Sequence, residues 1–278
     1  MLCAIWGLGQ IATKIGLEGI SPLFQAGLRS TGATAIILIW IALRKIPMNW
    51  RDGTGWLGVG IGLVFAMEFV CLYQGLVYTG AARATILLYT APFFVALGAH
   101  WLIPNDKLTL PKLIGLLLAF AGVLIAFYDR LGASNPKALL GDILCLAAAF
   151  FWAMTTVMVK ATRLRSVVPE KNLLYQLAVS SIVLMAGAQL AGEPGVFKGS
   201  ATVWLAFLYQ TLFIASISYL TWFFLIQRFR ASALASFTFL TPVFGVVFAW
   251  LLLGEPVTLT IVLAMMLIAA GIVLVNRA

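Results

Sequence analysis

The sequence predicts an all-α integral membrane protein in which ten transmembrane helices form two inverted five-helix repeats around a central cavity. Composition is the first observation behind this prediction. Of the 278 residues, 63% are hydrophobic and only 10% are charged, and the mean hydropathy is +1.05. A soluble chain of this length would need more polar surface to cover its core. Almost every segment between charge clusters is apolar and close to the roughly 20 residues that span a bilayer.

Internal repetition is the second observation. The stretch from Ala82 to Phe127 carries Pro92 within an apolar run, then a short polar break, then a second apolar run that contains glycines. The stretch from Ser232 to Val275 repeats this order, with Pro242 in the matching place. Repetition on this scale indicates that the chain is built from two copies of one unit.

Ten helices are expected, because a spanning segment must satisfy its own backbone hydrogen bonds and strict period-two alternation is absent. Their approximate ranges are 2–17, 22–43, 54–78, 83–103, 110–127, 138–160, 171–191, 202–224, 231–253 and 257–275. An odd number of helices in each half inverts the second half. We therefore expect a first repeat over 1–128, a linker over 129–137 and a second repeat over 138–278. Such inverted repeats are typical of transporters, whose sites lie near the midplane between the halves.

Basic residues predict the orientation of the chain. Most of the 18 lysines and arginines follow the second, fourth, sixth or eighth expected helix or lie at the C-terminus, and fewer, such as Lys198, lie on the other side. Because positive charge stays cytoplasmic, both termini are expected in the cytoplasm. The N-terminus lacks a basic region followed by a small-residue cleavage site, so we expect no removable signal peptide.

Several classes of function are excluded. The net charge of +9 is split into short clusters between apolar runs, so no nucleic acid is expected as a partner. Cys3, Cys71 and Cys145 lie inside apolar runs without metal-ligand spacing, so we expect neither disulfides nor a metal. No catalytic constellation and no Gly-x-x-x-x-Gly-Lys loop is present. We therefore expect no enzyme activity, no cofactor and no ATP; the expected partners are a small-molecule substrate and the lipid bilayer, and the oligomeric state stays open.

Two ionisable residues lie deep in the expected helices. At about 1.5 Å per residue, Arg29 lies about 10 Å and Glu68 about 15 Å from the outer ends of their helices. An unpaired charge at such a depth costs at least about 2.5–3.5 kcal/mol. We therefore expect Arg29 and Glu68 to form an ion pair, which is either structural or involved in proton coupling.

Pro92 and Pro242 lie near the centres of the fourth and ninth expected helices. Each removes one helical hydrogen bond and frees the carbonyl four residues earlier, that of Leu88 or of Thr238. A plain kink is the simpler interpretation for either proline alone. Two breaks at matching places in the two halves favour a binding cavity with Pro92 and Pro242 as gating hinges.

Aromatic and amide side chains recur along the expected helices. They could bind a flat amphipathic solute, with its ring against the aromatic side chains and its polar end on the amides. Packing against lipid is the alternative for any one of them. The candidate residues of the central cavity are Trp6, Gln10, Gln74, Tyr78, Tyr89, Pro92, Trp152, Thr155, Tyr175, Gln176, Gln210, Tyr219, Trp222, Thr238 and Pro242.

The repeat carries a family resemblance. The first helix of one half holds Trp6 and Lys14, and that of the other holds Trp152 and Lys160 at the same spacing. With a proline in each fourth helix, this pattern resembles the drug/metabolite transporter superfamily, and more narrowly its ten-helix EamA-type branch. Arg29 lies where that family often has an arginine.

The sequence departs from this family at two places. Ser180 replaces the arginine in the second half, and Asn105-Asp106 replaces the usual Gly-Glu that is present at Gly254-Glu255. The resemblance implies a secondary exporter of small metabolites that works by alternating access in the inner membrane of a bacterium, and we expect aromatic or other hydrophobic amino acids as its cargo. A drug or lipid exporter or flippase is the alternative, and a membrane-embedded lipid-modifying enzyme is the alternative of another class.

Overall fold

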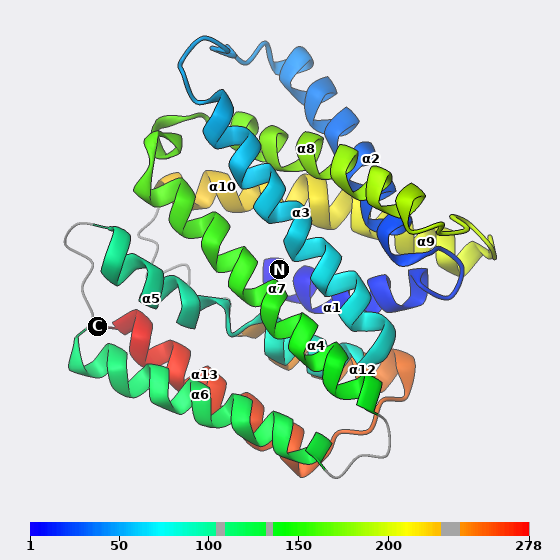
Figure 1. The fold of residues 1–278 in the computed structure, drawn as a ribbon, viewed down its shortest axis with the longest axis vertical. Helices are drawn as coiled ribbons and strands as arrows, with labels where there is room; N and C mark the ends of the chain where they lie inside the picture. The colour runs from blue at the N-terminus through cyan, green and yellow to red at the C-terminus, as the bar shows by residue number, and fades with distance from the viewer. Residues whose placement is uncertain (104–108, 132–135, 229–239, 278) are drawn as a thin grey trace.

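The computed structural model describes residues 1–103, 109–131, 136–228 and 240–277. Within these ranges the chain is helical, with one isolated bridge between Ile20 and Val196 and no strand. The first half contains α1 (Leu2–Gly16), α2 (Pro22–Arg44), α3 (Gly55–Tyr78), α4 (Ala81–Leu88), α5 (Ala91–Leu102) and α6 (Leu110–Leu131) (Figure 1). The second half contains α7 (Pro136–Ala161), the short turn η1 (Arg163–Ser166), α8 (Pro169–Leu190), α9 (Ala201–Tyr209), the π-helical η2 (Gln210–Ser218), α10 (Tyr219–Arg228), α12 (Leu240–Leu253) and α13 (Leu259–Arg277).

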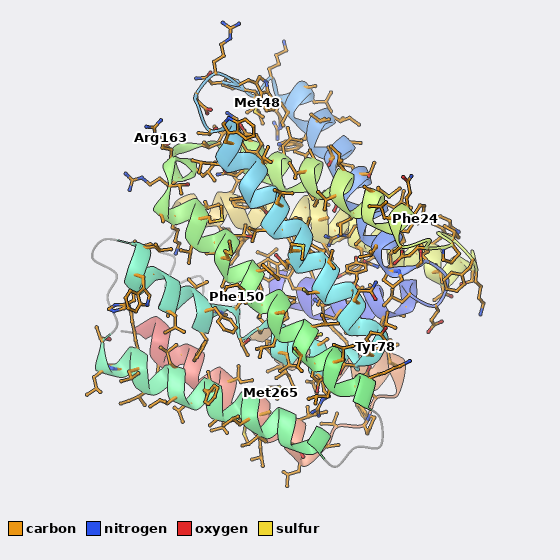
Figure 2. The ribbon with its side chains drawn as sticks, in the orientation of Figure 1. Phe24, Met48, Tyr78, Phe150, Arg163 and Met265 are labelled. Atoms are coloured by element: carbon orange, nitrogen blue, oxygen red, sulfur yellow. The ribbon has the colours of Figure 1, made fainter. Side chains whose placement is uncertain are left out.

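The outer surface is suited to lipid. Six stretches in the described ranges are long and apolar enough to cross a bilayer, and three shorter apolar stretches lie in α6, α12 and α13. Large apolar side chains stand outward, among them Leu190, which is 89% exposed, and Phe150 on α7 (Figure 2). Exposure of this kind over many elements fits a hydrocarbon solvent and not water. The helices and the apolar surface therefore confirm the predicted class, an all-α membrane protein.

The fourth expected helix is not continuous. Instead of one helix over 83–103, the chain forms α4 and α5 with a break at Tyr89 and Thr90. Pro92 lies in the first turn of α5, where a proline is tolerated because the N–H that it lacks would have no helical partner there. The Thr90 hydroxyl donates to the Leu87 carbonyl at 2.7 Å and so satisfies part of the break.

Other expected boundaries also differ. Residues 201–228 are helical throughout, but their middle part, η2, is π-helical, which the sequence did not predict. The helices α6 and α7 extend into the expected linker at 129–137 and leave only 132–135 between them, outside the described residues. Pro242 is the third residue of α12, and the earlier part of the expected ninth helix, including Thr238, also lies outside the described residues.

Helices of the two halves pack in reciprocal pairs. α6 lies beside α13, and α2 packs on α8 (Figure 1). In the same manner α1 packs against α12, and α7 packs against α4 and α5. Glycines permit the close approach: a Cβ at Gly62 of α3 would lie 2.5 Å from the Cβ of Val179 on α8. The most extensive helix packing is therefore between the halves.

Two carboxylates satisfy helix ends across this interface. Glu255 follows a glycine with a φ of 64° and accepts hydrogen bonds from the backbone N–H groups of Ala81 and Ala82 at 2.7 and 3.0 Å. Glu193, after a second such glycine, accepts from the N–H groups of Leu23 and Phe24 at 3.1 and 2.9 Å. Anionic groups at helix N-termini are favoured by the unpaired N–H groups and the helix dipole. Each carboxylate therefore fixes the start of a first-half helix to the end of a second-half helix.

We expect Gly271→Leu to lower the thermal stability of the detergent-solubilised protein. A Cβ at this position would collide with the backbone oxygen of Gly115 and would lie 2.7 Å from the nitrogen of Ala119, so α6 and α13 would have to separate. Overpacking of this kind costs about 1–3 kcal/mol. Gly55→Ala is the control, because a Cβ there meets nothing within 4 Å. Equal melting temperatures for the two variants would contradict the close packing of α6 on α13.

Candidate functional site

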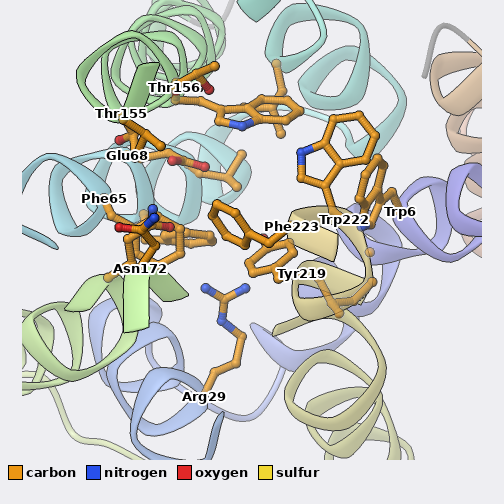
Figure 3. A pocket seen from close by; sticks show the side chains of 18 of the residues that line it. Trp6, Arg29, Phe65, Glu68, Thr155, Thr156, Asn172, Tyr219, Trp222 and Phe223 are labelled. Atoms are coloured by element: carbon orange, nitrogen blue, oxygen red, sulfur yellow. Dashed lines mark hydrogen bonds between the residues drawn. The ribbon is translucent and has the colours of Figure 1, made fainter. Parts of the chain in front are cut away.

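A cavity of about 420 Å³ lies between the halves of the chain (Figure 3). Its lining comes from α1, α2, α3 and the end of α4 in the first half, and from α7, η1, α8, η2 and α10 in the second, with Tyr89 just after α4. The sequence-predicted residues that line it are Trp6, Gln10, Arg29, Glu68, Tyr89, Trp152, Thr155, Gln176, Gln210, Tyr219 and Trp222. These residues are far apart in the chain, and the packing of the halves brings them to one place.

Five predicted residues do not line this cavity. Gln74, Tyr78, Pro92 and Pro242 are absent from its wall. Tyr175 lies instead at the loop before α3, where its ring meets Trp50 edge to face at 6.3 Å. Gln74, Tyr78 and Tyr175 lie on other faces of α3 and α8, which do contribute to the wall. The helices α5 and α12, which hold Pro92 and Pro242, contribute no described residue to it. Thr238 lies outside the described residues.

A salt bridge fixes the α2–α3 loop, which Tyr175 of α8 contacts. Lys171, at the start of α8, donates to the Asp52 carboxylate at 2.7 Å and to the Asn49 carbonyl at 2.5 Å. The Lys171 ammonium and the Thr54 hydroxyl lower the pKa of Asp52 to about 2. Because Asp52 is then ionised at neutral pH, the bridge ties the α2–α3 loop to the second half of the chain.

Aromatic rings form most of the apolar wall. Trp6 and Trp222 meet edge to face with ring centroids 5.1 Å apart, and Tyr89 and Trp152 do so at 5.5 Å. In each of these two pairs, one ring comes from each half of the chain. Edge-to-face pairs hold rings in fixed orientations while their remaining faces stay available for contact. The wall can therefore receive a planar apolar group.

Gln210 connects three elements beneath the cavity. Its amide oxygen accepts from the Tyr73 hydroxyl at 2.6 Å and from the Thr13 hydroxyl at 3.3 Å. Its amide nitrogen donates to the carbonyls of Ala12 at 3.1 Å and Ala206 at 3.3 Å. Gln210 also begins the π-helical segment, a conformation that is frequent at functional sites. Its hydrogen-bonding capacity is filled by protein, so its role is to hold α1, α3 and η2 together.

Arg29 and Glu68 reach the same cavity but do not form the direct ion pair expected from their depths. Among the described residues neither has a salt bridge, and Arg29 Nε, Arg29 Nη2 and Glu68 Oε2 are buried without a hydrogen-bond partner. The guanidinium lies instead over the ring of Phe69, 3.9 Å from its centroid. Depth gives the position of a residue along a helix axis and not its direction around it, and here the guanidinium faces an aromatic ring.

Several lining residues were missed from the sequence. Phe65 and Phe69 are one helical turn apart on α3 and flank Glu68, so their helical spacing is a usable signal. Asn172 lies one turn before the predicted residue Gln176 on α8, so the same helical spacing could have identified it. Its Oδ1 is buried without a partner among the described residues. Phe223, one residue after Trp222, offered no such signal.

The two ends of the cavity differ. One end is lined by Lys160, Leu164 and Arg165, at the end of α7 and in η1, and Arg165 is exposed. The ends of α1 and α3 and the starts of α4 and α7 gather at the opposite end (Figure 1). No residue of the α4 or α7 starts lines the cavity. Among the described residues, the cavity therefore reaches the surface on the α7–η1 side and is closed on the other.

Hydrogen bonds join the helices at the closed end. Lys14 donates to the carbonyls of Leu76 and Thr79 at 2.5 and 2.6 Å, which caps the C-terminus of α3 from α1. Arg83 of α4 forms a salt bridge with Asp142 of α7 at 3.3 Å, and the Thr79 hydroxyl donates to the same carboxylate. Together with the Glu255 cap, these contacts connect α1, α3, α4, α7 and α12. Within the described part of the chain, no cluster of His, Cys, Asp and Glu could hold a metal ion.

Comparison with known proteins agrees with this architecture. The uncharacterized transporter YvbV of Bacillus subtilis (strain 168) is 30% identical over 279 residues, which cover 99% of this chain and 89% of that protein. A probable amino-acid metabolite efflux pump of Escherichia coli (strain K12) is 29% identical, with 98% of this chain and 91% of that protein covered. A solved crystal structure shares the fold, with a TM-score of 0.71 at 20% identity over 99% of this chain and 94% of that one.

The family model matches twice. The EamA-like transporter model covers residues 1–128 and again residues 139–277. This confirms the resemblance carried by the Trp and Lys residues of the two halves, and it indicates a transporter that is embedded in a membrane and acts on a small molecule. The chain therefore belongs to the EamA-like transporter family of the drug/metabolite transporter superfamily.

Proposed function

We propose that this protein exports aromatic or other hydrophobic amino acids from the cytoplasm by alternating access. The aromatic cavity between the halves is the observation that carries the proposal. Its volume of about 420 Å³ falls within the range of small-molecule sites, and its wall combines rings with a few polar groups. The efflux-pump name of the Escherichia coli relative supports export and an amino-acid metabolite as cargo.

Ten membrane-spanning helices in two inverted repeats are part of this proposal. Under it, α2 corresponds to α8 and α6 to α13, and each of these helices packs on its own counterpart. Likewise, the packing of α1 on α12 corresponds to the packing of α7 on α4 and α5. A two-fold axis in the membrane plane would produce this reciprocity, and two matches of one family model support it. In this scheme helices 1 to 4 (α1, α2, α3 and α4) and helices 6 to 8 (α7, α8 and η2 with α10) line the cavity. Helix 9, which contains α12, ends beside the closed end, where Glu255 follows it.

The open and closed ends support an inward-facing state. The open end lies on the side of Lys160 and Arg165, where positive charge predicts the cytoplasm. The closed end, formed by Lys14, Arg83, Asp142 and Glu255, then faces outward. We name these four residues the outer gate. A cycle of export would open the outer gate while α7 and η1 close the cytoplasmic side.

Flux into proteoliposomes tests this function. Purified protein should give saturable flux of labelled phenylalanine or tryptophan without nucleotide and without any added enzyme substrate. Flux of a cationic dye or scrambling of a fluorescent phospholipid, with no amino-acid flux, would favour the drug or lipid exporter. Conversion of a lipid into a product would favour the membrane-embedded enzyme.

The topology gives a separate prediction. Impermeant maleimide should label a cysteine at Lys198 from outside intact cells, and label one at Arg163 only after the membrane is opened. A C-terminal reporter should be active in the cytoplasm. These results follow from ten spans with both termini cytoplasmic in the inner membrane. Labelling of positions 163 and 198 from the same side would contradict the ten-helix count and the inverted repeat.

A further inference from the structure

The cavity contains buried polar atoms that the protein itself leaves unpaired. Among the described residues, Arg29 Nε and Nη2, Glu68 Oε2, Gln10 Oε1 and Asn172 Oδ1 have no hydrogen-bond partner, and all four residues line the cavity. Arg29 is 2% exposed and Glu68 is 5% exposed. Buried polar groups are normally paired, so each exception needs an explanation. Uncharged groups of Ser21, Gln25, Ser30, Trp40 and Thr241 are also unpaired away from the cavity. Both charged exceptions among the described residues, Arg29 and Glu68, lie in the cavity, and this indicates that their partner is a ligand.

The arrangement of Arg29 favours a carboxylate. Its guanidinium points into the cavity, with Tyr219 and Phe223 beside it (Figure 3). Phe69 contacts the face of the guanidinium, which leaves the hydrogen-bonding edge with Nε and Nη2 free. Arginine offers such an edge to both oxygens of a carboxylate at once. Contact with a ring face stabilises the charge but does not satisfy its donors.

Glu68, on another helix, requires a positively charged donor, whereas Arg29 requires a carboxylate. It lies on α3, its Oε2 is an acceptor without a donor, and Arg29 on α2 does not fill that role. A ligand ammonium would provide the missing donor, and Gln10 Oε1 and Asn172 Oδ1 of the same cavity wall are acceptors as well. The other cations in the described part of the wall, Lys160 and Arg165, lie at the open end, where Lys160 is half-buried and Arg165 is exposed.

We propose that Arg29 and Glu68 bind the carboxylate and the ammonium of one zwitterionic α-amino acid, while the aromatic wall holds its side chain. This inference rests on the proposed function and makes it specific. It predicts that the intact zwitterion is selected over the corresponding amine and over the corresponding acid. Either analogue would leave one buried charge of the protein unpaired, which costs more than the lost contact alone.

Three probes with the same ring test the inference. These are L-phenylalanine, phenethylamine, which lacks the carboxylate, and 3-phenylpropionate, which lacks the ammonium. Their affinities are measured as competition against labelled L-phenylalanine or, for variants that bind it weakly, by calorimetry on the purified full-length protein. The wild type should bind L-phenylalanine about 10- to 100-fold more tightly than either analogue, as expected for one charge-assisted contact.

The two variants should change selectivity in opposite directions. Arg29→Gln should weaken binding of phenylalanine and phenylpropionate about 10- to 100-fold and leave phenethylamine within about threefold of the wild type. Glu68→Gln should weaken binding of phenylalanine and phenethylamine and leave phenylpropionate nearly unchanged. Arg44→Gln, on the exposed end of α2, and Glu18→Gln, exposed after α1, are matched controls that should bind all three probes as the wild type does.

Each outcome decides between the two proposals. A structural role for Arg29 and Glu68 would weaken all probes equally, and that result overturns the inference but leaves export of amino acids intact. If the wild type binds and transports none of the three, the proposed substrate class is wrong as well. If Arg29→Gln or Glu68→Gln fails to give a single peak in size exclusion, Arg29→Lys and Glu68→Asp take their place. These keep the charges but shift them, and the same opposite changes in selectivity are required of them.

Discussion

Glu255→Gln is expected to open the closed end of the cavity from outside. A cysteine placed at Gln10, in a background without Cys3, Cys71 and Cys145, should react with impermeant maleimide in intact cells at least about tenfold faster in this variant. The Glu255 carboxylate accepts two backbone hydrogen bonds at the start of α4. Hydrogen bonds to a charged group contribute about 1.5–3 kcal/mol each. Glutamine keeps a single acceptor oxygen and no charge, so the inward-facing state loses stability relative to the outward-facing state.

The control separates this effect from a general loss of surface charge. Glu18→Gln removes a carboxylate near the same end of α1, but Glu18 is exposed and should leave the reactivity at position 10 unchanged. Asp142→Asn should act in the same direction as Glu255→Gln, because Asp142 accepts from both Arg83 and Thr79. If reactivity stays at the wild-type level in Glu255→Gln and Asp142→Asn, the outer gate is a static part of the fold.

Much of the fold could be predicted because the bilayer imposes simple rules. Apolar runs of spanning length predicted the helices, since lipid offers no alternative partner for the backbone. The repeated order around Pro92 and Pro242 predicted the family. Trp6 and Trp152 were predicted as lining residues because each is an aromatic residue close to a polar one, Gln10 or Thr155, and both reach the cavity.

Directions around helix axes could not be predicted in the same manner. Successive residues of a helix differ by about 100°, so Leu72 of α3 lines the cavity while Gln74, two residues later, does not. In these helices the faces toward lipid and the faces packed on other helices are both mostly apolar, which weakens the amphipathic pattern that reveals the inner face of a soluble helix. The absence of a direct Arg29–Glu68 pair has the same origin. The cap that Glu255 makes on α4 joins residues more than half the chain apart, and no local pattern reports it.

Pro92→Ala is expected to give a protein that is at least as stable as the wild type but transports more slowly. Pro92 has no N–H to donate to the Leu88 carbonyl, and the chain is interrupted at Tyr89 and Thr90. Alanine restores that donor and has the highest helix propensity, so the α4 and α5 segments can join. Joining them would rotate Tyr89, which lines the cavity beside Trp152 at 5.5 Å.

The measurement pairs a melting temperature in detergent with flux in proteoliposomes. We expect an unchanged or higher melting temperature together with flux reduced by about tenfold or more, a combination that misfolding cannot produce. Pro22→Ala is the matched control, because Pro22 is the first residue of α2 and interrupts nothing.

Pro242→Ala tests the proline at the matching place in the second half of the chain. Pro242 is buried in the first turn of α12, at the place that corresponds to Pro92 in the repeat. Because the proposed halves are inverted, the two alanine variants should favour opposite-facing states. Cysteines at Gln10 and at Val159, both in the cavity wall, report which end is accessible in each variant. If both variants transport at the wild-type rate, helix interruption is not needed for the cycle, and the movement must arise where whole helices slide past one another at the outer gate.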